Sequence, residues 1–469
     1  GARGEGEEPT TSIPGVVIKA TQYVTREHHQ PELHDGNPIV VGDKPWEGLD
    51  GIHQVACPIV LFDEQEQVWK MWYHSHGSRG YFGKHVDGYK NNLGWYVLYA
   101  TSADGICWDK PALGVCDILG YEGTNVVRSL PHPSSGQDSK FVFKDLDEAD
   151  PERRYKGFDS HRPMSPIYSP DGVHWTKGPT VPRVGDECSH FVYDPWNRRY
   201  ITFTRNQYKG SKFMMSQGQR TARWIYTAFS TDLCEWTQPE LILAPDREDP
   251  FDLSFYEMSG LAYEGMYIGF LHRFTTSGLG VSDTIDVELI SSRDGLNWQR
   301  TPARKPFIPL GPKGSWNAGM VFVRSVVVHG DEIRFYLSGS EGAHGQSGRG
   351  GTIGLASLPR DRFVSIAAPK MSDRHLQMGR TPTLLTKPLY STGDRLVINA
   401  QAEGSIRGEL LDLEGRVREG FEGGDCDPFT GDSVEHVVRW QGGSSLKGLW
   451  PSRIRFTLER ARIYSLQIR

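Results

Sequence analysis

The chain has 469 residues, 23% of them charged, and a formal net charge of −6. This balance offers no basic patch for nucleic acid, and no apolar run reaches the 18 residues of a membrane span, so we expect neither a nucleic-acid partner nor a membrane. The 53 glycines and 29 prolines indicate an all-β protein with many turns, and the length allows two or three domains.

Residues 1–50 are predicted to form an N-terminal extension that leads into the first repeated unit. A start at Gly1 rather than Met fits either a removed signal peptide or an artificial boundary. We expect a secreted or periplasmic bacterial protein. The spacing of His28, His29 and His34 fits no standard metal site. Cys107 and Cys116 flank a predicted hairpin, and this leaves a disulfide and two free thiols as alternatives.

A turn phrase of the form Ser-x-Asp-(Gly/Leu)-x-x-Trp repeats at intervals of 61 to 67 residues. The four copies begin at Ser102, Ser169, Ser230 and Ser292, and a degenerate fifth copy begins at Ser357. We interpret the phrase as structural: Asp and Gly form the turn, Ser bonds within it, and Trp packs between units. A period of this length in β-rich sequence predicts a five-bladed β-propeller over residues 51–365.

Each repeat contains a pair of short strands rich in β-branched and aromatic residues, separated by turn residues. The predicted pairs are 59–62 with 68–73, 141–143 with 154–158, 191–193 with 200–205, 261–263 with 266–271, and 320–323 with 333–337. From residue 366 the repeat stops. Strands at 396–399, 408–413, 434–440, 454–458 and 461–466 predict a C-terminal β-sandwich over 366–469.

The repeats allow equivalent residues to be compared, and carboxylates recur at the start of the first strand of each unit. The units align on an acidic residue that follows this strand: Asp63, Asp145, Asp194 and Glu264. Seven positions earlier stand Ala56, Asp138, Glu187 and Glu257, of which three are carboxylates. In a propeller the first strands line the channel, so Asp138, Glu187 and Glu257 are predicted to face one another. Glycoside hydrolysis uses paired carboxylates in this way.

The phrases around two of these carboxylates resemble known glycosidase motifs. Gln137-Asp138-Ser139 resembles the second-blade Arg-Asp-Pro phrase, and Asp186-Glu187-Cys188 the third-blade Glu-Cys phrase, of the invertase/fructosidase class of five-bladed glycoside hydrolases. The chain is thus distantly similar to that clan and the arabinanase-type clan. The resemblance implies that Asp138 steadies the oxocarbenium-like sugar and that Glu187 is the general acid/base. It also suggests a furanoside, fructosyl or arabinosyl, as substrate.

The first blade departs from that family, whose nucleophile is an Asp at this mouth. Here the stretch from His53 to Pro58 has no Asp in register, and Asp50 and Glu47 lie upstream. Glu257 or Asp50 is therefore expected to replace the nucleophile, unless the enzyme inverts through water.

Further substrate-binding residues are expected at the ends of the second strands and in the fifth blade. Arg and His beside carboxylates bind sugar hydroxyls and tune pKa values, and aromatic rings stack on sugars, although each such group can equally serve in a salt bridge or in the core. With Asp50, the candidates are His74, Asp159, His161, Arg205, Arg273, Trp316 and Asn317.

These observations favour a glycosidase that cleaves a terminal sugar from an oligo- or polysaccharide. One alternative is a glycoside phosphorylase, in which phosphate replaces the missing nucleophile and Arg205 and Arg273 bind it. Another is a glycan-binding propeller without catalysis. A carbohydrate is the expected partner in all three cases. No cofactor is expected, although the channel of a propeller could hold a structural Ca²⁺.

Overall fold

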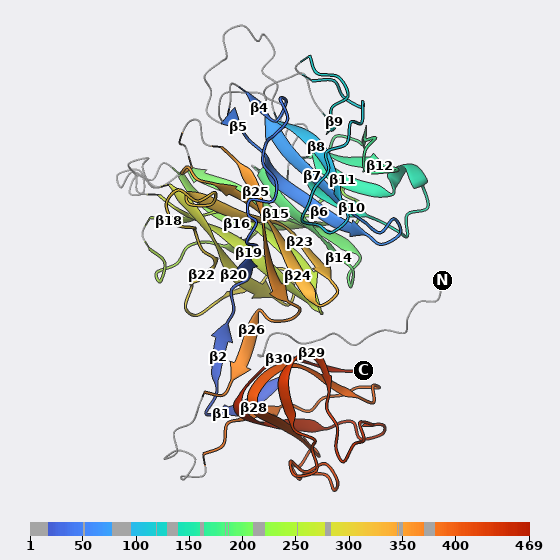
Figure 1. Cartoon of the computed structure of the whole chain (residues 1–469), viewed down its shortest axis with the longest axis vertical. Coiled ribbons are helices and arrows are strands. Elements are labelled where there is room, and N and C mark those ends of the chain that lie inside the picture. Colours follow the sequence, from blue (N-terminus) through green and yellow to red (C-terminus); the bar gives the residue numbers. More distant parts are fainter. Residues whose placement is uncertain are drawn as a thin grey trace. The chain divides into compact units, whose positions relative to one another are not determined.

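The computed structural model describes residues 17–49, 52–76, 95–118, 120–128, 139–159, 164–182, 184–185, 187–209, 221–250, 252–276, 283–344, 346, 350–369 and 380–469. The chain divides into two units (Figure 1). The central unit comprises Pro31–His329 and Ile333–Ser357. The terminal unit comprises the described residues up to Gln30, Gly330–Glu332 and Leu358–Arg469. The described part is all-β, apart from one 3-10 turn, η1 (Pro151–Arg153).

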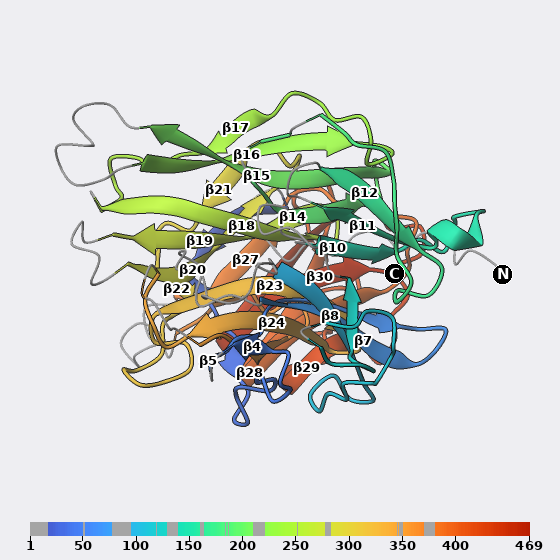
Figure 2. The ribbon, with the colours of Figure 1, turned by 90° about the horizontal axis from the view of Figure 1, so that it is seen from above.

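The central unit consists of antiparallel sheets whose strands follow one another in the chain. The first sheet contains β6 (Ala56–Asp63), β7 (Val68–His76), β8 (Trp95–Ser102) and β9 (Val126–Arg128). The second contains β10 (Ser139–Lys144), β11 (Tyr155–Asp159), β12 (Ser165–Ser169) and β13 (Thr176–Lys177). The third contains β14 (Glu187–Asp194), β15 (Arg199–Lys209), β16 (Thr221–Ser230) and β17 (Glu240–Leu243). Figure 2 shows β15, β16 and β17 lying side by side, as their pairing requires.

Two further groups of strands complete this unit. The fourth is β18 (Leu253–Tyr263), β19 (Met266–Thr275) and β20 (Thr284–Ser292), with β21 (Trp298–Arg300) and β22 (Pro306–Ile308) on β20. The fifth is β23 (Met320–His329), β24 (Glu332–Ser340), β25 (Thr352–Pro359) and β3 (Glu32–Leu33), joined to the fourth by one parallel pairing of Ile285 with Met320. All five predicted strand pairs are therefore confirmed.

The first strands of these five groups contact one another in a closed order. β6 contacts β10, β10 contacts β14, β14 contacts β18, β18 contacts β23, and β23 contacts β6 again. Side-chain hydrogen bonds support the last closure: the Ser325 hydroxyl on β23 accepts from the amide of Val60 on β6 at 3.0 Å and donates to its carbonyl at 3.0 Å. The chain thus returns from its last group of strands to its first.

The repeated turn phrase forms the same hydrogen-bonded turn in each of its four full copies, which confirms its structural interpretation. In each, the Asp carboxylate accepts two backbone amides at 2.7–2.8 Å, and the Ser hydroxyl accepts a third at 2.8–2.9 Å. Each turn also touches the second strand of the preceding sheet. For example, the Trp72 indole on β7 donates to the carbonyl of Gly172 at 2.6 Å and lies edge-on to Trp175.

Acidic residues at the ends of first strands join neighbouring sheets through buried hydrogen bonds. The Asp63 carboxylate, 1% exposed, accepts from Lys70, from Lys144 of the next sheet and from Tyr155. Burial raises the pKa of Asp63, but these three donors outweigh it and hold the pKa well below its ordinary value. Tyr267 donates in the same way to Asp194, at 2.6 Å.

The N-terminal segment pairs with the last sheet of the central unit before the chain reaches β6. β3 pairs with β25, and Val40 bridges to Ile353, so the segment adds an outer strand to the last sheet. Without it, the outer edge of β25 would expose unpaired amides and carbonyls.

The terminal unit contains one hydrogen-bonded sheet of seven strands. They are β1 (Ile18–Gln22), β2 (Thr25–His28), β26 (Val364–Ala367), β27 (Thr383–Thr386), β28 (Leu396–Leu411), β29 (Phe429–Val437) and β30 (Arg453–Ile468). The strands predicted separately at 396–399 and 408–413 are both parts of β28, and those at 454–458 and 461–466 are both parts of β30. Irregularities in their pairing near Ala402 and Ser405 interrupt the apolar pattern, which explains the error. The sandwich stays a prediction.

Three further findings concern the described residues only. Cys107 has a free thiol, so the disulfide between Cys107 and Cys116 that the sequence left open is not formed. In this part of the chain no group of three or more His, Cys, Asp or Glu side chains is placed to hold a metal ion. Nor does it contain a helix with the length and hydropathy needed to cross a membrane.

Candidate functional site

A β-bulge lies near the start of the first strand in each of the first four sheets. The pairing shifts between Ala56 and Ile59, Ser139 and Val142, Cys188 and His190, and Phe255 and Glu257. Bulges re-aim side chains and are frequent beside active sites. Their repetition at the same end of four contacting strands marks this end as the candidate functional site.

The second-strand residues selected from the sequence lie directly opposite these starts. The cross-strand pairs are Ala56 with His74, Ser139 with Asp159, Glu187 with Arg205, and Glu257 with His272. The structure therefore places six of the sequence-selected or aligned positions at one end of the sheets. Asp50, Asp138 and His161 lie outside the described residues, and Glu187 is described by its backbone alone.

Of the three aligned carboxylates, Glu257 is the one whose side chain the structure describes. It is 2% exposed, and Arg324 on β23 donates to its Oε2. The Nδ1 atom of His272 lies 4.0 Å from the same oxygen. The guanidinium carbon of Arg324 lies 4.5 Å from the centre of the Phe322 ring. Arg324 thus places a positive charge directly beside the Glu257 carboxylate.

Sequence reasoning missed Arg324, although a signal was present. The stretch Met320-Val-Phe-Val-Arg-Ser-Val is apolar except for this residue and the following serine. A charged residue inside an apolar strand is rarely buried unless it has a partner. No motif pointed to that partner, because Glu257 lies in a different repeat.

A cluster of aromatic and cationic side chains adjoins Glu257 through its neighbour Tyr256. Arg205 donates to the carbonyl of Tyr256 at 3.2 Å, and its guanidinium carbon lies 4.7 Å from the ring centre. The guanidinium of Arg223, on β16, lies 5.0 Å from the same ring and 4.8 Å from that of Phe274. The Tyr256 hydroxyl and His344 Nε2 are 2.9 Å apart. Arg223 and His344 stand in no repeated phrase, so the sequence comparison could not find them.

Trp316 and Asn317 precede β23, as the sequence placed them. The Trp316 indole lies against two glycines: a Cβ atom at Gly339 or Gly354 would fall 2.2 Å from its ring. Asn317 is 1% exposed, and its Oδ1 accepts from Ser315 at 3.0 Å. Its Nδ2 has no hydrogen-bond partner among the described residues. A polar partner such as a ligand hydroxyl or water would remove the free-energy cost of a buried amide donor without a hydrogen bond.

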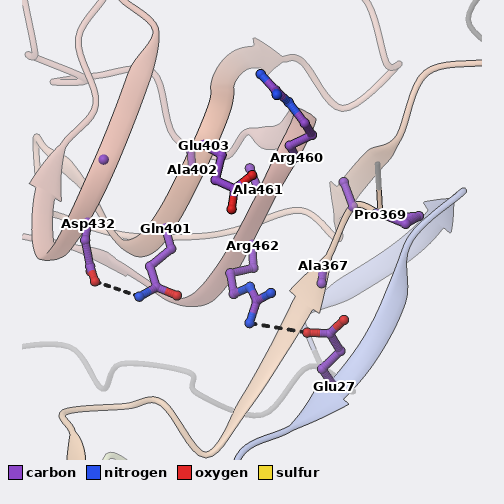
Figure 3. Close-up of a pocket in the computed structure, with 12 residues that line it drawn as sticks. Glu27, Ala367, Pro369, Gln401, Ala402, Glu403, Asp432, Arg460, Ala461 and Arg462 are labelled. Atoms are coloured by element: carbon purple, nitrogen blue, oxygen red, sulfur yellow. Dashed lines mark hydrogen bonds and ion pairs between the residues drawn. The ribbon is translucent and has the colours of Figure 1, made fainter. Parts of the chain in front are cut away.

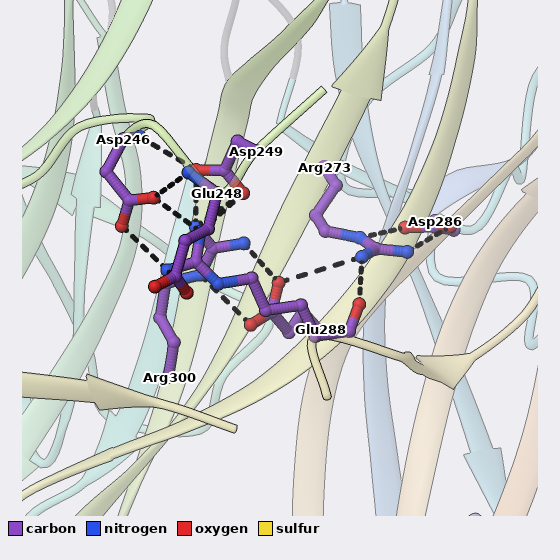
Figure 4. A network of polar contacts seen from close by, with 8 residues as sticks. Asp246, Glu248, Asp249, Arg273, Asp286, Glu288 and Arg300 are labelled. Atoms are coloured by element: carbon purple, nitrogen blue, oxygen red, sulfur yellow. Dashed lines mark hydrogen bonds and ion pairs between the residues drawn. The ribbon is translucent and has the colours of Figure 1, made fainter. Parts of the chain in front are cut away.

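Two of the predicted substrate-binding residues are engaged in ion pairs. Asp159 accepts both terminal nitrogens of Arg128, at 2.7 and 2.9 Å. Arg273 donates twice to Asp286, at 2.6 and 2.7 Å, within a network that continues through Glu288 (Figure 4). The sequence left open whether Arg273 binds substrate or forms a structural salt bridge. The structure shows the salt bridge, and both of its partners belong to the same sheet. The 1% exposed His74 lies buried in the first sheet.

No protein-family model matches the chain, and no curated protein matches its sequence. Three solved structures illustrate its structural similarities. The N-acetylgalactosamine deacetylase from F. plautii, in complex with blood group B trisaccharide, has a TM-score of 0.46 and 16% identity over 74% of this chain and 96% of its own. The β-1,2-mannobiose phosphorylase from Listeria innocua has a TM-score of 0.48 and 12% identity over 70% of this chain and 96% of its own. A glycosyl hydrolase from Bacteroides ovatus has a TM-score of 0.43 and 14% identity over 72% of this chain and 95% of its own. At these TM-scores and identities, the likenesses assign neither an activity nor a site to this chain.

Proposed function

We propose that the chain is a carbohydrate-active enzyme, a glycoside hydrolase built on a five-bladed β-propeller with an accessory β-sandwich. The closed order of contacts among β6, β10, β14, β18 and β23 supports the propeller, because blades arranged around a channel contact one another in a closed ring. The bond cleaved is that of a terminal, furanosidic sugar on an oligo- or polysaccharide.

The observation that carries the proposal is the ion pair of Glu257 with Arg324 at the start of β18. Glycosidases need one carboxylate that stays charged and one acid that delivers a proton. Arg324 favours the charged form of Glu257, so this residue suits the nucleophile, or the base that activates water. Glu187, at the start of the contacting strand β14, is then assigned the acid/base role and Asp138 that of the transition-state stabiliser.

The stereochemical outcome depends on the separation of the Glu187 and Glu257 carboxyl groups. In retaining enzymes the two groups are about 5–5.5 Å apart, and in inverting enzymes about 6.5–9.5 Å, which leaves room for water. The first-blade position holds Ala56, which can neither attack nor accept a proton. The nucleophile or base must therefore come from another strand, and Glu257 is the proposed source.

A glycoside phosphorylase is the second candidate, and one specific observation favours it. The guanidinium groups of Arg205 and Arg223 both lie against the ring of Tyr256, next to Glu257. Two guanidinium groups near one aromatic ring bring together the positive charge that phosphate needs. Arg273, the other arginine suggested from the sequence, has its charge balanced by Asp286 and Glu288 and is a poorer phosphate ligand.

A sugar-release assay tests the proposal. The purified chain is incubated with aryl furanosides, aryl pyranosides, arabinan and levan, with and without phosphate. Glu257→Gln and Glu187→Gln run beside Glu235→Gln, which makes the same change on an exposed turn. We expect release that both site variants lose and the control keeps. Dependence on phosphate would identify a phosphorylase, and sugar binding without any turnover would leave a non-catalytic propeller.

A further inference from the structure

The terminal unit contains a cavity of about 580 Å³ on its seven-stranded sheet. Its lining comes from β2, β26, β28, β29 and β30 and the residues next to them, all within this unit (Figure 3). The polar lining residues are Glu27, Gln401, Glu403, Asp432, Arg460 and Arg462. It belongs to a different unit from the carboxylates of the candidate active site and uses none of their residues.

Small side chains explain why the sheet is hollow at this place. Ala367 and Ala368 at the end of β26, Ala402 on β28 and Ala461 on β30 all line the cavity, and each is at most 7% exposed. Ala368, Ala402 and Ala461 belong to the hydrophobic core of this unit, whereas Ala367, Gln401 and Arg462 are paired neighbours in the sheet. The pairing of β28 with β30 is also irregular between Ala402 and Ser405. Ala367, Pro369 and Gly431 are thus small residues that line the cavity without belonging to this core.

The rim carries hydrogen-bonding groups of both charges in nearly equal number. Arg462 and Glu27 form an ion pair at 3.5 Å, and Gln401 donates to Asp432 at 2.6 Å, as the dashed lines of Figure 3 show. Arg362 donates to the Asp432 carboxylate from outside the cavity and holds its pKa below the ordinary value. Asp432 therefore remains a charged acceptor.

The two remaining charged residues of the rim, Glu403 and Arg460, are exposed and make no ion pair with any described residue. Arg460 has a positive φ of 42°, a backbone conformation that is uncommon for residues other than glycine. Together they offer an acceptor and several donors to a molecule lying in the cavity.

We propose that this cavity is a second binding site, for a neutral saccharide. A sugar ring has an apolar face that suits the apolar lining of Ala367 and Pro369, and hydroxyls around its edge that both donate and accept hydrogen bonds. Mixed charges on the rim satisfy both kinds of hydroxyl, whereas a polyanion would meet Glu27, Glu403 and Asp432. This site would hold a polysaccharide while another part of it is processed elsewhere, and its binding does not depend on the proposed hydrolysis.

Affinity electrophoresis of the full chain tests this inference. Gels are cast with arabinan, levan or yeast mannan, and with polygalacturonate as the anionic comparison. The background variant is Glu257→Gln, so that the polymer is not consumed. The cavity variant adds Glu403→Gln and Arg460→Asn, where Asn tolerates the positive φ. Both positions are exposed, so the fold should be kept, and Glu414→Gln with Arg416→Asn on an exposed turn of the same unit is the control pair.

We expect at least one neutral polysaccharide to retard the background and control proteins, and the cavity variant to bind about tenfold more weakly. Equal retardation of all three proteins would overturn the proposal, because binding would then reside elsewhere. Retardation by polygalacturonate alone, or by none of the polymers, would overturn it as well. Sugar release by the wild-type chain is measured separately, so a failure here and a failure of the proposed hydrolysis are distinguishable.

Discussion

The guanidinium of Arg324 on β23 donates to the carboxylate of Glu257 on β18, so one ion pair joins the first strands of two contacting groups. The two residues are 10% and 3% exposed in their side chains. Removal of one partner from a buried pair is costly, because the remaining charge loses its compensation.

We therefore expect Arg324→Met to lower the free energy of unfolding by about 3 kcal/mol. The double variant Glu257→Gln/Arg324→Met should recover part of this loss, because no buried carboxylate is then left behind. Urea denaturation followed by circular dichroism measures both. Arg247→Met, at an exposed position, is the control. A change of less than about 0.5 kcal/mol for Arg324→Met, as at ordinary surface positions, would contradict the expected role of the pair.

The repeated turns supply a matched pair of glycine variants. Gly172 and Gly295 both have φ near +80° (83° and 80°), which an alanine adopts at a cost of about 1–2 kcal/mol. A Cβ at Gly172 would lie 2.6 Å from Trp72 of the preceding sheet, whereas at Gly295 its nearest neighbour is Ile201 at 3.5 Å. Gly172→Ala should therefore destabilise by about 3 kcal/mol and Gly295→Ala by about 1 kcal/mol.

Thermal unfolding of the two variants would show the difference. Equal losses would mean that the turn conformation alone matters and that the contact with Trp72 does not. Leu233 occupies the equivalent position of the third turn with φ 67°, and its 1% exposed side chain contributes to the core there. This copy shows that the turn accepts a side chain when the neighbouring sheet leaves space for it.

The fold was more predictable from the sequence than the candidate site, for a physical reason. Local patterns determine hairpins and turns, so the five strand pairs and the four turn phrases could be predicted. The pair of Glu257 with Arg324, and the arginines around Tyr256, arise where strands from different repeats meet. No local pattern encodes such contacts.

The terminal unit illustrates the same limit. β28 and β30 are long strands interrupted by irregular pairing, and each interruption has the appearance of a turn in sequence. The pairing of β3 with β25 joins residues far apart in the chain, and two residues are too few to give a strand pattern. The roles of Asp138, Glu187 and Glu257 stay predictions that rest on the resemblance and on Glu257's ion pair.

Stability should fall in acid partly through Asp246 (Figure 4). Its two hydrogen bonds with Arg304, at 2.7 and 2.8 Å, are the main cause that lowers its pKa from 3.8 to about 2. A carboxylate whose pKa is lower in the folded than in the unfolded state stabilises the folded state at pH values above the unfolded-state pKa. This contribution is lost as the pH falls from about 4 to about 2.

Asp246→Asn should accordingly lower the melting temperature at pH 6 and have little effect at pH 2, so that the two curves converge in acid. Added salt should narrow the gap at pH 6, since the pair is exposed and screened. Melting temperatures measured from pH 2 to 6 by differential scanning fluorimetry give both trends. A constant gap across this range would show that Asp246 acts through packing or backbone effects instead of its charge.

The position of Trp316 should control substrate affinity if its indole stacks on a sugar, as the proposed function implies. Because a Cβ at Gly354 would lie 2.2 Å from the ring, Gly354→Ala must displace the indole. We expect KM to rise about tenfold with a smaller change in kcat, because a stacking contact is made in the ground state and the transition state alike. Trp316→Ala should give the same result, while Gly424→Ala, where the added methyl meets no atom within 4 Å, should match the wild type. Steady-state kinetics on the sugar identified in the release assay provide the values. If KM stays unchanged in both variants while circular dichroism shows a native fold, Trp316 belongs to the core of the last sheet and contributes nothing to binding.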